Sequence, residues 1–230
     1  RNGHGDVERH GRGPDRGGQS VLDYLVRTQD RQILLFTPPF DKTPHDPGYI
    51  KGYLPGIREN GGQYTHAAIW TVWAFAQMGD GDQAGELFKL LNPVLQSDTL
   101  QKANTYVVEP YVVCADIYSI PPLVRHGGWT WYTGSAAWLY RLGIEATLGF
   151  QKLGNSLKID PVIPQAWEGF EIRYKFGESL YHIRVENADH VERGIRSISL
   201  DGKELQENKI PLLDGKREYQ VVVTMGKERD

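Results

Sequence analysis

The sequence predicts an α+β fold, in which a helical part over residues 21–152 precedes an antiparallel β module over residues 153–230. Two observations carry this prediction. From Gln63 onward, apolar side chains recur at intervals of three and four, which is the period of one helix face. After Gly154, apolar and polar residues alternate, as in half-buried strands. The 230 residues are 40% hydrophobic and 24% charged, which is an ordinary globular composition.

Residues 1–20 are expected to be a disordered segment outside the folded core. The first 18 positions hold six glycines, four arginines and one aliphatic side chain, so they bury too little apolar surface to offset the entropy cost of ordering. The alternating His4, Asp6, Glu8 and His10 could bind a metal weakly. A solvated tail is the preferred interpretation, and no metal site is assigned. Because the segment lacks the apolar run of a signal peptide, a cytoplasmic location is expected.

About four helices, arranged as hairpins, are expected in the helical part. A loop over 37–62 interrupts them, because its five prolines forbid a continuous helix or a central strand. An ordered loop of this length is usually functional. In chain order, the predicted segments are a short helix or strand over 21–26, a helix over 63–79, a helix capped by Asp80 or Asp82 and stopped by Pro93, one or two turns over 96–103, a buried helix over 110–118 and a helix from Gly134 to Leu148.

The β module is expected to contain short antiparallel strands joined by tight turns. Gly177 and the pair Asp201 and Gly202 supply the turn chemistry. The predicted strands are 157–159, 170–176, 180–185, 198–200 and 219–224.

Charge and hydropathy exclude several classes of partner. Lys and Arg number 26 against 29 Asp and Glu, so the net charge is −3 and no broad basic surface is expected to attract nucleic acid or an anionic membrane. No run approaches about 18 apolar residues, so no membrane-spanning segment is expected.

The segment 58–66, Arg-Glu-Asn-Gly-Gly-Gln-Tyr-Thr-His, is the first that could carry chemistry. It places strong hydrogen-bonding side chains where a loop enters a helix. Backbone N–H groups in the first turn of a helix are unpaired and favour an anion, and His66 could donate a further hydrogen bond to it. The same pattern also fits a capped helix in which His66 packs in the core, and spacing alone does not separate the two.

The segment 127–135, Gly-Gly-Trp-Thr-Trp-Tyr-Thr-Gly-Ser, precedes another helix in the same way. Thr133 or Ser135 is a natural N-cap, and Gly134 would let a ligand approach the helix N-terminus closely. Trp129 and Trp131 offer flat walls for sugar rings. A buried aromatic cluster with an ordinary cap is the alternative. Together the two segments indicate a pocket for an anion and a carbohydrate.

Three stretches are identified as similar to glycoside hydrolase family 94: PGYIKGYLPGIRENGGQYTHAAIW, YVVEPYVVCADIY and GGWTWYTGSAAWLYRLGIEATLGF. That family contains cellobiose and chitobiose phosphorylases, β-1,2-oligoglucan phosphorylases and the carboxyl-terminal part of cyclic β-1,2-glucan synthases. The resemblance covers about residues 30–225, and ENGGQYTHAA is closest to the β-1,2-glucan group. It implies a partial (α/α)6 barrel, of which the chain would hold about four helices, followed by a β-sandwich-like module.

The resemblance also implies a reaction, the inverting phosphorolysis of β-glucans with inorganic phosphate as co-substrate and no cofactor. His66, Thr133 and Gly134 match the phosphate-binding positions of the family. Glu59 resembles a sugar-binding carboxylate. The other residues expected to bind sugar are Arg58, Gln63, Tyr64, Trp129 and Trp131.

Two departures from the family bear on activity. The Asp-Trp-Asn-Asp type motif that carries the general acid does not occur in the chain, and Ala115 and Asp116 stand near the place of a sugar-binding Gln in cellobiose phosphorylases. The chain alone is therefore expected to be inactive, as a fragment that associates with the missing barrel part, forms a homodimer or lies within a membrane-bound synthase. The alternatives are a noncatalytic carbohydrate-binding module and an inverting hydrolase that uses Glu59 and Glu109.

Overall fold

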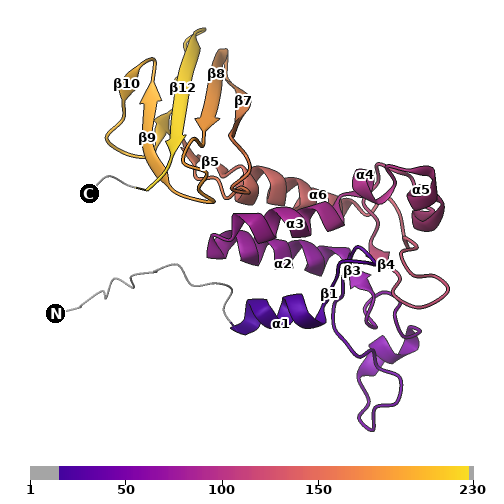
Figure 1. The fold of residues 1–230 in the computed structure, drawn as a ribbon. Coiled ribbons are helices and arrows are strands. Elements are labelled where there is room, and N and C mark those ends of the chain that lie inside the picture. Colours follow the sequence, from indigo (N-terminus) through magenta and orange to yellow (C-terminus); the bar gives the residue numbers. More distant parts are fainter. Residues whose placement is uncertain (1–15, 228–230) are drawn as a thin grey trace.

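The computed structural model describes residues 16–227, in which a helical part is followed by a β part (Figure 1). Helix α2 packs against both α3 and α6, and the sheets stand at one end of these helices (Figure 1). The helical elements are α1 (Arg16–Tyr24), a 3-10 turn η1 (Gly48–Gly52), α2 (Thr65–Met78), α3 (Gly81–Leu91), α4 (Pro93–Gln96), α5 (Leu100–Tyr106), α6 (Thr133–Arg141) and a π-helical turn η2 (Leu142–Thr147). The predicted α+β class is confirmed.

The hairpin of α2 and α3 forms for the reasons its sequence suggests. Gly79 adopts φ 84°, a left-handed conformation that glycine reaches without strain, and this ends α2. Asp80 then caps α3, because its carboxylate accepts a hydrogen bond of 3.0 Å from the Gln83 N–H. The core between the two helices contains Ile69, Phe75, Leu87 and other buried apolar residues.

Three helix predictions need correction. Residues 16–20, predicted to be disordered, are helical and belong to α1. The same helix carries Val21 and Leu22, which pack against the α2–α3 core and so hold it in place. Residues 1–15, which contain the weak metal-binding pattern, lie outside the described residues. The segment 110–118 is extended, not helical. The last predicted helix is α-helical only to Arg141 and then widens into η2.

The extended course of 110–118 results from pairing with a distant segment. Strand β4 (Asp116–Ile117) pairs antiparallel with β3 (Gln63–Tyr64), and Ala115 accepts a hydrogen bond of 2.9 Å from the Thr65 N–H. These backbone bonds replace those of the predicted helix, and β-branched residues in the segment suit a strand.

A single side chain orders much of the loop over 37–62. Asn60 is fully buried, and its amide nitrogen donates to the carbonyl groups of Phe40 and Tyr53 at 2.9 and 2.8 Å. Its Oδ1 accepts from the Phe40 N–H at 2.7 Å. The loop is therefore held in one conformation where it enters β3.

The β part is made of two sheets around one core. The strands of these two sheets are β5 (Phe150–Leu153), β6 (Ser156–Ile159), β7 (Gly169–Phe176), β8 (Ser179–Glu186), β9 (Ile195–Leu200), β10 (Lys203–Glu204), β11 (Ile210–Pro211) and β12 (Glu218–Met225). The order is β10-β9-β12-β8-β7 in one sheet and β11-β6-β5 in the other. Leu157, Ile183 and Val223 are among the residues that fill the core between them.

The prediction of purely antiparallel strands is wrong at one pairing. β12 runs parallel to β8, with Val221 opposite Ile183, and antiparallel to β9. The chain between β8 and β12 first forms β9, β10 and β11, so that β12 returns in the direction of β8 and inserts beside it. Alternation within a strand reports which face is buried but not the direction of its neighbour.

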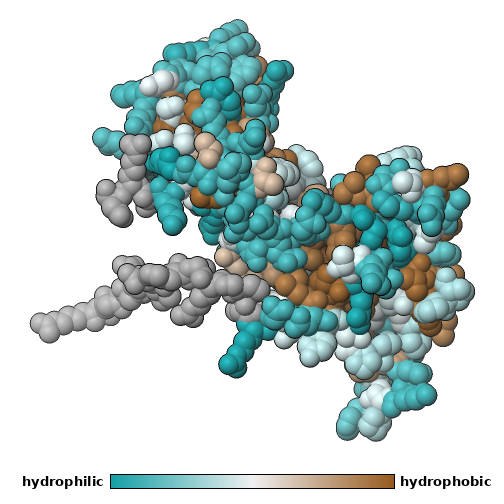
Figure 2. Space-filling model, viewed as in Figure 1, coloured by the Kyte–Doolittle hydropathy of each residue, from teal (hydrophilic) through white to brown (hydrophobic). Residues whose placement is uncertain are grey.

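Parts of the helical surface are apolar. On α2, Trp70 is 52% exposed and Met78 is 42% exposed, and hydrophobic residues gather on the visible face of the helical part (Figure 2). Among the described residues, none of the helices combines the length and apolar character needed to cross a membrane. Whether these helices form part of an (α/α)6 barrel stays a prediction.

Candidate functional site

The N-terminal ends of α2 and α6 lie together. Tyr64 and Tyr132 are the N-cap residues of the two helices, and their hydroxyl oxygens are 3.3 Å apart. Neither tyrosine caps its helix through the side chain. The prediction that Thr133 or Ser135 is the N-cap was wrong, because both lie within the first turn of α6. Two first turns without a side-chain cap therefore begin side by side, although the Thr65 N–H donates to the Ala115 carbonyl.

Polar side-chain atoms without partners gather in these first turns. Thr65 Oγ1, His66 Nε2 and Ser135 Oγ are buried and have no hydrogen-bond partner within residues 16–227. Thr65 is 2% exposed and Ser135 is fully buried. Buried polar groups are nearly always hydrogen-bonded, so such a group implies a further partner or a functional role. By contrast, nothing lies within 4 Å of the Cβ position at Gly134, where a ligand could approach.

His66 is held by aromatic rings from both helices. Its imidazole centroid is 4.7 Å from the ring of Trp70 on α2 and 5.8 Å from the ring of Trp138 on α6. This contact orients the imidazole while Nε2 stays without a partner. The ring thus packs against its neighbours, as the core interpretation of His66 predicts, and the anion-binding interpretation stays a prediction. That His66 and Thr133 bind the same anion stays a prediction.

The loop before α2 brings a cation onto an exposed tryptophan. The Arg58 guanidinium carbon lies 4.3 Å from the ring centroid of Trp129, which is 64% exposed. Glu59 Oε2 is 4.0 Å from Arg58 Nε, and neither atom has a hydrogen-bond partner in the described part of the chain. Two of the predicted sugar-binding segments therefore meet, with a flat ring, a guanidinium and a carboxylate at one place.

Asp116 joins these two loops and was not predicted to do so. It is 1% exposed, and its Oδ2 accepts a hydrogen bond of 3.1 Å from the Arg58 N–H. The Gly128 N–H donates to the Asp116 carbonyl at 2.8 Å. Burial raises the pKa of the Asp116 carboxyl above its ordinary value, while the Arg58 N–H opposes that shift. The sequence signals were an acidic residue in an apolar run and its place near a sugar-binding Gln of the family, and neither pointed to the Arg58 loop.

Three further predicted residues occupy different settings. Gln63 is 1% exposed and its Oε1 accepts from the Ile33 N–H at 2.9 Å, so its side chain fixes the strand that leads into α2. The hydrogen bond with Tyr132, then burial, raises the pKa of Tyr64 to about 12. Trp131 is 62% exposed, and its indole N–H donates to Glu109 Oε1 at 3.0 Å.

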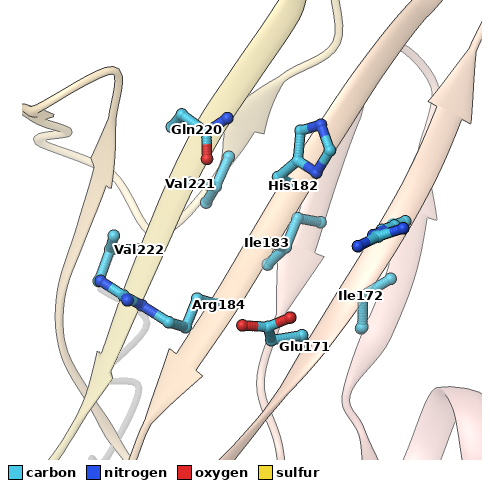
Figure 3. A pocket seen from close by; sticks show the side chains of 9 residues that line it. Glu171, Ile172, His182, Ile183, Arg184, Gln220, Val221 and Val222 are labelled. Carbon is cyan, nitrogen blue, oxygen red and sulfur yellow. The ribbon is translucent and has the colours of Figure 1, made fainter.

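The outer face of the large sheet carries a separate shallow pocket. His182, Arg184 and Gln220 line it from β8 and β12, with Glu171 and Arg173 from β7 (Figure 3). No Phe, Tyr or Trp side chain is in this lining. Nor do the described residues contain a group of three His, Cys, Asp or Glu side chains that could hold a metal ion.

Comparison with known families decides the classification. The family model described as "Glycosyl hydrolase 94 superfamily, catalytic domain" matches residues 10–149. The chain belongs to this family. The match contains every predicted site residue of both helix starts, including the segments 58–66 and 127–135.

The proteins to which this chain is similar include a synthase and several phosphorylases. The cyclic β-(1,2)-glucan synthase NdvB of Rhizobium meliloti (strain 1021) is 49% identical over 183 residues, which are 80% of this chain and 6% of that protein. The N,N'-diacetylchitobiose phosphorylase of Vibrio proteolyticus is 34% identical over 84% of this chain and 24% of its own length. The 1,2-β-oligoglucan phosphorylase of Listeria innocua is 29% identical over 57% of this chain and 13% of its own length.

The glycosyl hydrolase 94 chain thus spans a quarter or less of these three relatives. A solved α-mannosidase of family GH92 from Bacteroides thetaiotaomicron covers 69% of this chain and 18% of its own, at 10% identity and a TM-score of 0.29. That score is too low to establish a shared fold.

Proposed function

We propose that this chain supplies the phosphate-binding and sugar-binding loops of a glycoside phosphorylase that acts on β-glucans, with β-1,2 linkages favoured. The observation that carries the proposal is the pair of adjacent, uncapped helix starts with unpartnered His66, Thr65 and Ser135 atoms. The names of the relatives, which are phosphorylases and a β-1,2-glucan synthase, support the reaction class.

An oxyanion is the ligand that best fits the two helix starts. A helix N-terminus carries about half a positive charge and N–H donors that lack partners within the helix. His66 Nε2 would donate to the same anion when protonated, and the Ser135 and Thr65 hydroxyls would each donate as well. The family resemblance assigned phosphate to His66, Thr133 and Gly134 only. The hydroxyls of Thr65 and Ser135 were missed, although both stand in the first turn where such donors are useful.

The proposed reaction places the sugar beside this anion. A phosphate oxygen attacks the anomeric carbon, the glycosidic C–O bond breaks, and the departing oxygen takes a proton from a general acid. Arg58 and Glu59 would hold sugar hydroxyls, and the exposed face of Trp129 would cover the ring. The chain has no Asp-Trp-Asn-Asp type motif, so we expect the acid to come from a further polypeptide segment. The exposed Trp70 and Met78 would suit packing against such a segment or a second copy.

Phosphate-dependent stability tests the proposal directly. Urea unfolding would be compared in 10 mM phosphate and in chloride of equal ionic strength. If the site has a Kd of about 1 mM, bound phosphate stabilises the folded chain by roughly 1.4 kcal/mol. His66→Ala should lose this gain, and the exposed loop variant His45→Ala should keep it. Equal stability of the unmodified chain in phosphate and chloride would contradict the anion site.

A turnover assay tests the need for an added acid. The purified chain should form no glucosyl phosphate from β-1,2-gluco-oligosaccharides and phosphate, because proton donation typically contributes about 10²–10⁴ in rate. Turnover by the chain alone would contradict this part of the proposal.

A further inference from the structure

A second hollow lies behind the loop that carries Arg58 and Glu59. It has a volume of about 260 Å³ and is formed by three segments within 27–39, 55–61 and 119–121. Neither Arg58 nor Glu59 lines it. We propose that this hollow is a separate carbohydrate subsite that holds one glucosyl ring of a β-glucan. The choice of glucose rests on the proposed function.

Gln32, one of the residues that line the hollow, has an unsatisfied polar group. This residue is fully buried, and its Nε2 donates to the Tyr118 carbonyl at 2.5 Å. Its Oε1 is buried and accepts no hydrogen bond from any residue the structure describes. A buried acceptor of this kind is normally satisfied, so a hydroxyl donor from a ligand is the missing partner that fits it best.

The rim of the hollow carries one cation and one anion. Arg27 stands directly opposite Gln32 in the hairpin of β1 (Val26–Arg27) and β2 (Gln32–Ile33), so the two side chains share a face. Within residues 16–227, neither the Arg27 guanidinium nor the Asp30 carboxylate forms a hydrogen bond or an ion pair. The Asp30 carboxylate acts only at longer range, on the charge of Arg125. Because the two charges cancel, a neutral ligand with hydroxyl donors and acceptors suits the rim better than an oxyanion.

The walls of the hollow are apolar and fixed. Leu34, Pro39 and Ile120 are part of the lining, and such surfaces suit the C–H face of a sugar ring. Gly61 also lines it, with φ +85°, and a Cβ there would lie 2.9 Å from Pro39 Cβ. Ser119 Oγ donates to the Gly61 carbonyl at 3.0 Å, which holds this wall in place. The wall therefore belongs to the same loop that presents Arg58 on its other side.

Residue-resolved NMR on the chain tests this subsite. A β-1,2-linked glucose disaccharide would be titrated without phosphate, and the backbone amides of Leu34 and Ile120 and the side-chain amide of Gln32 should shift together. Asp30→Asn and Arg27→Ala should each raise the apparent Kd from these shifts at least fivefold.

The matched controls Asp41→Asn and Lys42→Ala change exposed residues of the same loop outside the lining and should leave the Kd unchanged. His66→Ala should also leave it unchanged, so failure of the anion site and failure of this subsite are distinguishable. Shifts confined to 58–66 and 127–135, no shifts at all, or shifts that survive both Asp30→Asn and Arg27→Ala would overturn the inference.

Discussion

Replacing Gly128 with alanine should disrupt the link between the two sugar-binding loops. A Cβ at this position would collide with Asp116 Oδ1 and lie 2.7 Å from Asp116 Cγ. The carboxylate cannot swing aside into solvent, because Asp116 is 1% exposed and its Oδ2 accepts the hydrogen bond from the Arg58 N–H. Relief of the collision therefore requires that this hydrogen bond break or that the backbone of the 127–135 segment move.

The cost can be estimated from its parts. Loss of a hydrogen bond to a charged group costs about 1.5–3 kcal/mol, and an extra carbon in a packed site costs about 1–3 kcal/mol. Reduced freedom of the unfolded chain returns about 0.4–1 kcal/mol when alanine replaces glycine. Gly128→Ala should therefore lower the free energy of unfolding by about 2–5 kcal/mol.

Urea unfolding of Gly128→Ala and Gly134→Ala measures this effect against a matched change. Nothing lies within 4 Å of a Cβ at Gly134, so that variant should be as stable as the unmodified chain or up to about 1 kcal/mol more stable. In an Asp116→Ala background the collision partner is gone, so Gly128→Ala should then cost much less. Equal stability of the two glycine variants would refute the reasoning.

Three further outcomes are expected. Tyr132→Phe removes the hydrogen bond that is the largest cause of the raised pKa of Tyr64, so ultraviolet titration should show a Tyr64 phenolate at lower pH than the present value of about 12. Ser135→Ala removes a buried hydroxyl without a partner, so stability in chloride should be unchanged or higher by up to about 1 kcal/mol while phosphate binding weakens about tenfold. Burial acts to raise the pKa of Asp160, but the Arg193 guanidinium and a neighbouring lysine lower it overall, so the ion pair should stabilise the fold at neutral pH. Asp160→Asn should therefore lower the free energy of unfolding by about 1 kcal/mol at neutral pH. In urea unfolding curves this difference should disappear as the pH falls below about 4.

Local chemistry was sufficient to predict several elements. The α2–α3 hairpin follows from Gly79 and Asp80, which end one helix and cap the next within two residues. Alternation predicted the strands β7, β8 and β12, because the side chains of a strand point to its two faces in turn. The motifs around residues 58–66 and 127–135 pointed to the family that the comparison then confirmed.

Contacts between distant segments set the remaining features. The 110–118 segment is extended because β4 pairs with β3, some 50 residues earlier, and no pattern within the segment contains that partner. The contact of Asp116 with the Arg58 loop was therefore not predicted. The parallel pairing of β12 with β8 likewise depends on a contact between distant segments. The residues that begin α2 and α6 could be read from the sequence, including His66 and Thr133. The meeting of the two helix starts depends on packing between segments about 70 residues apart in the chain. Periodicity reports only which face of an element is buried. It contains no information about which other element covers that face.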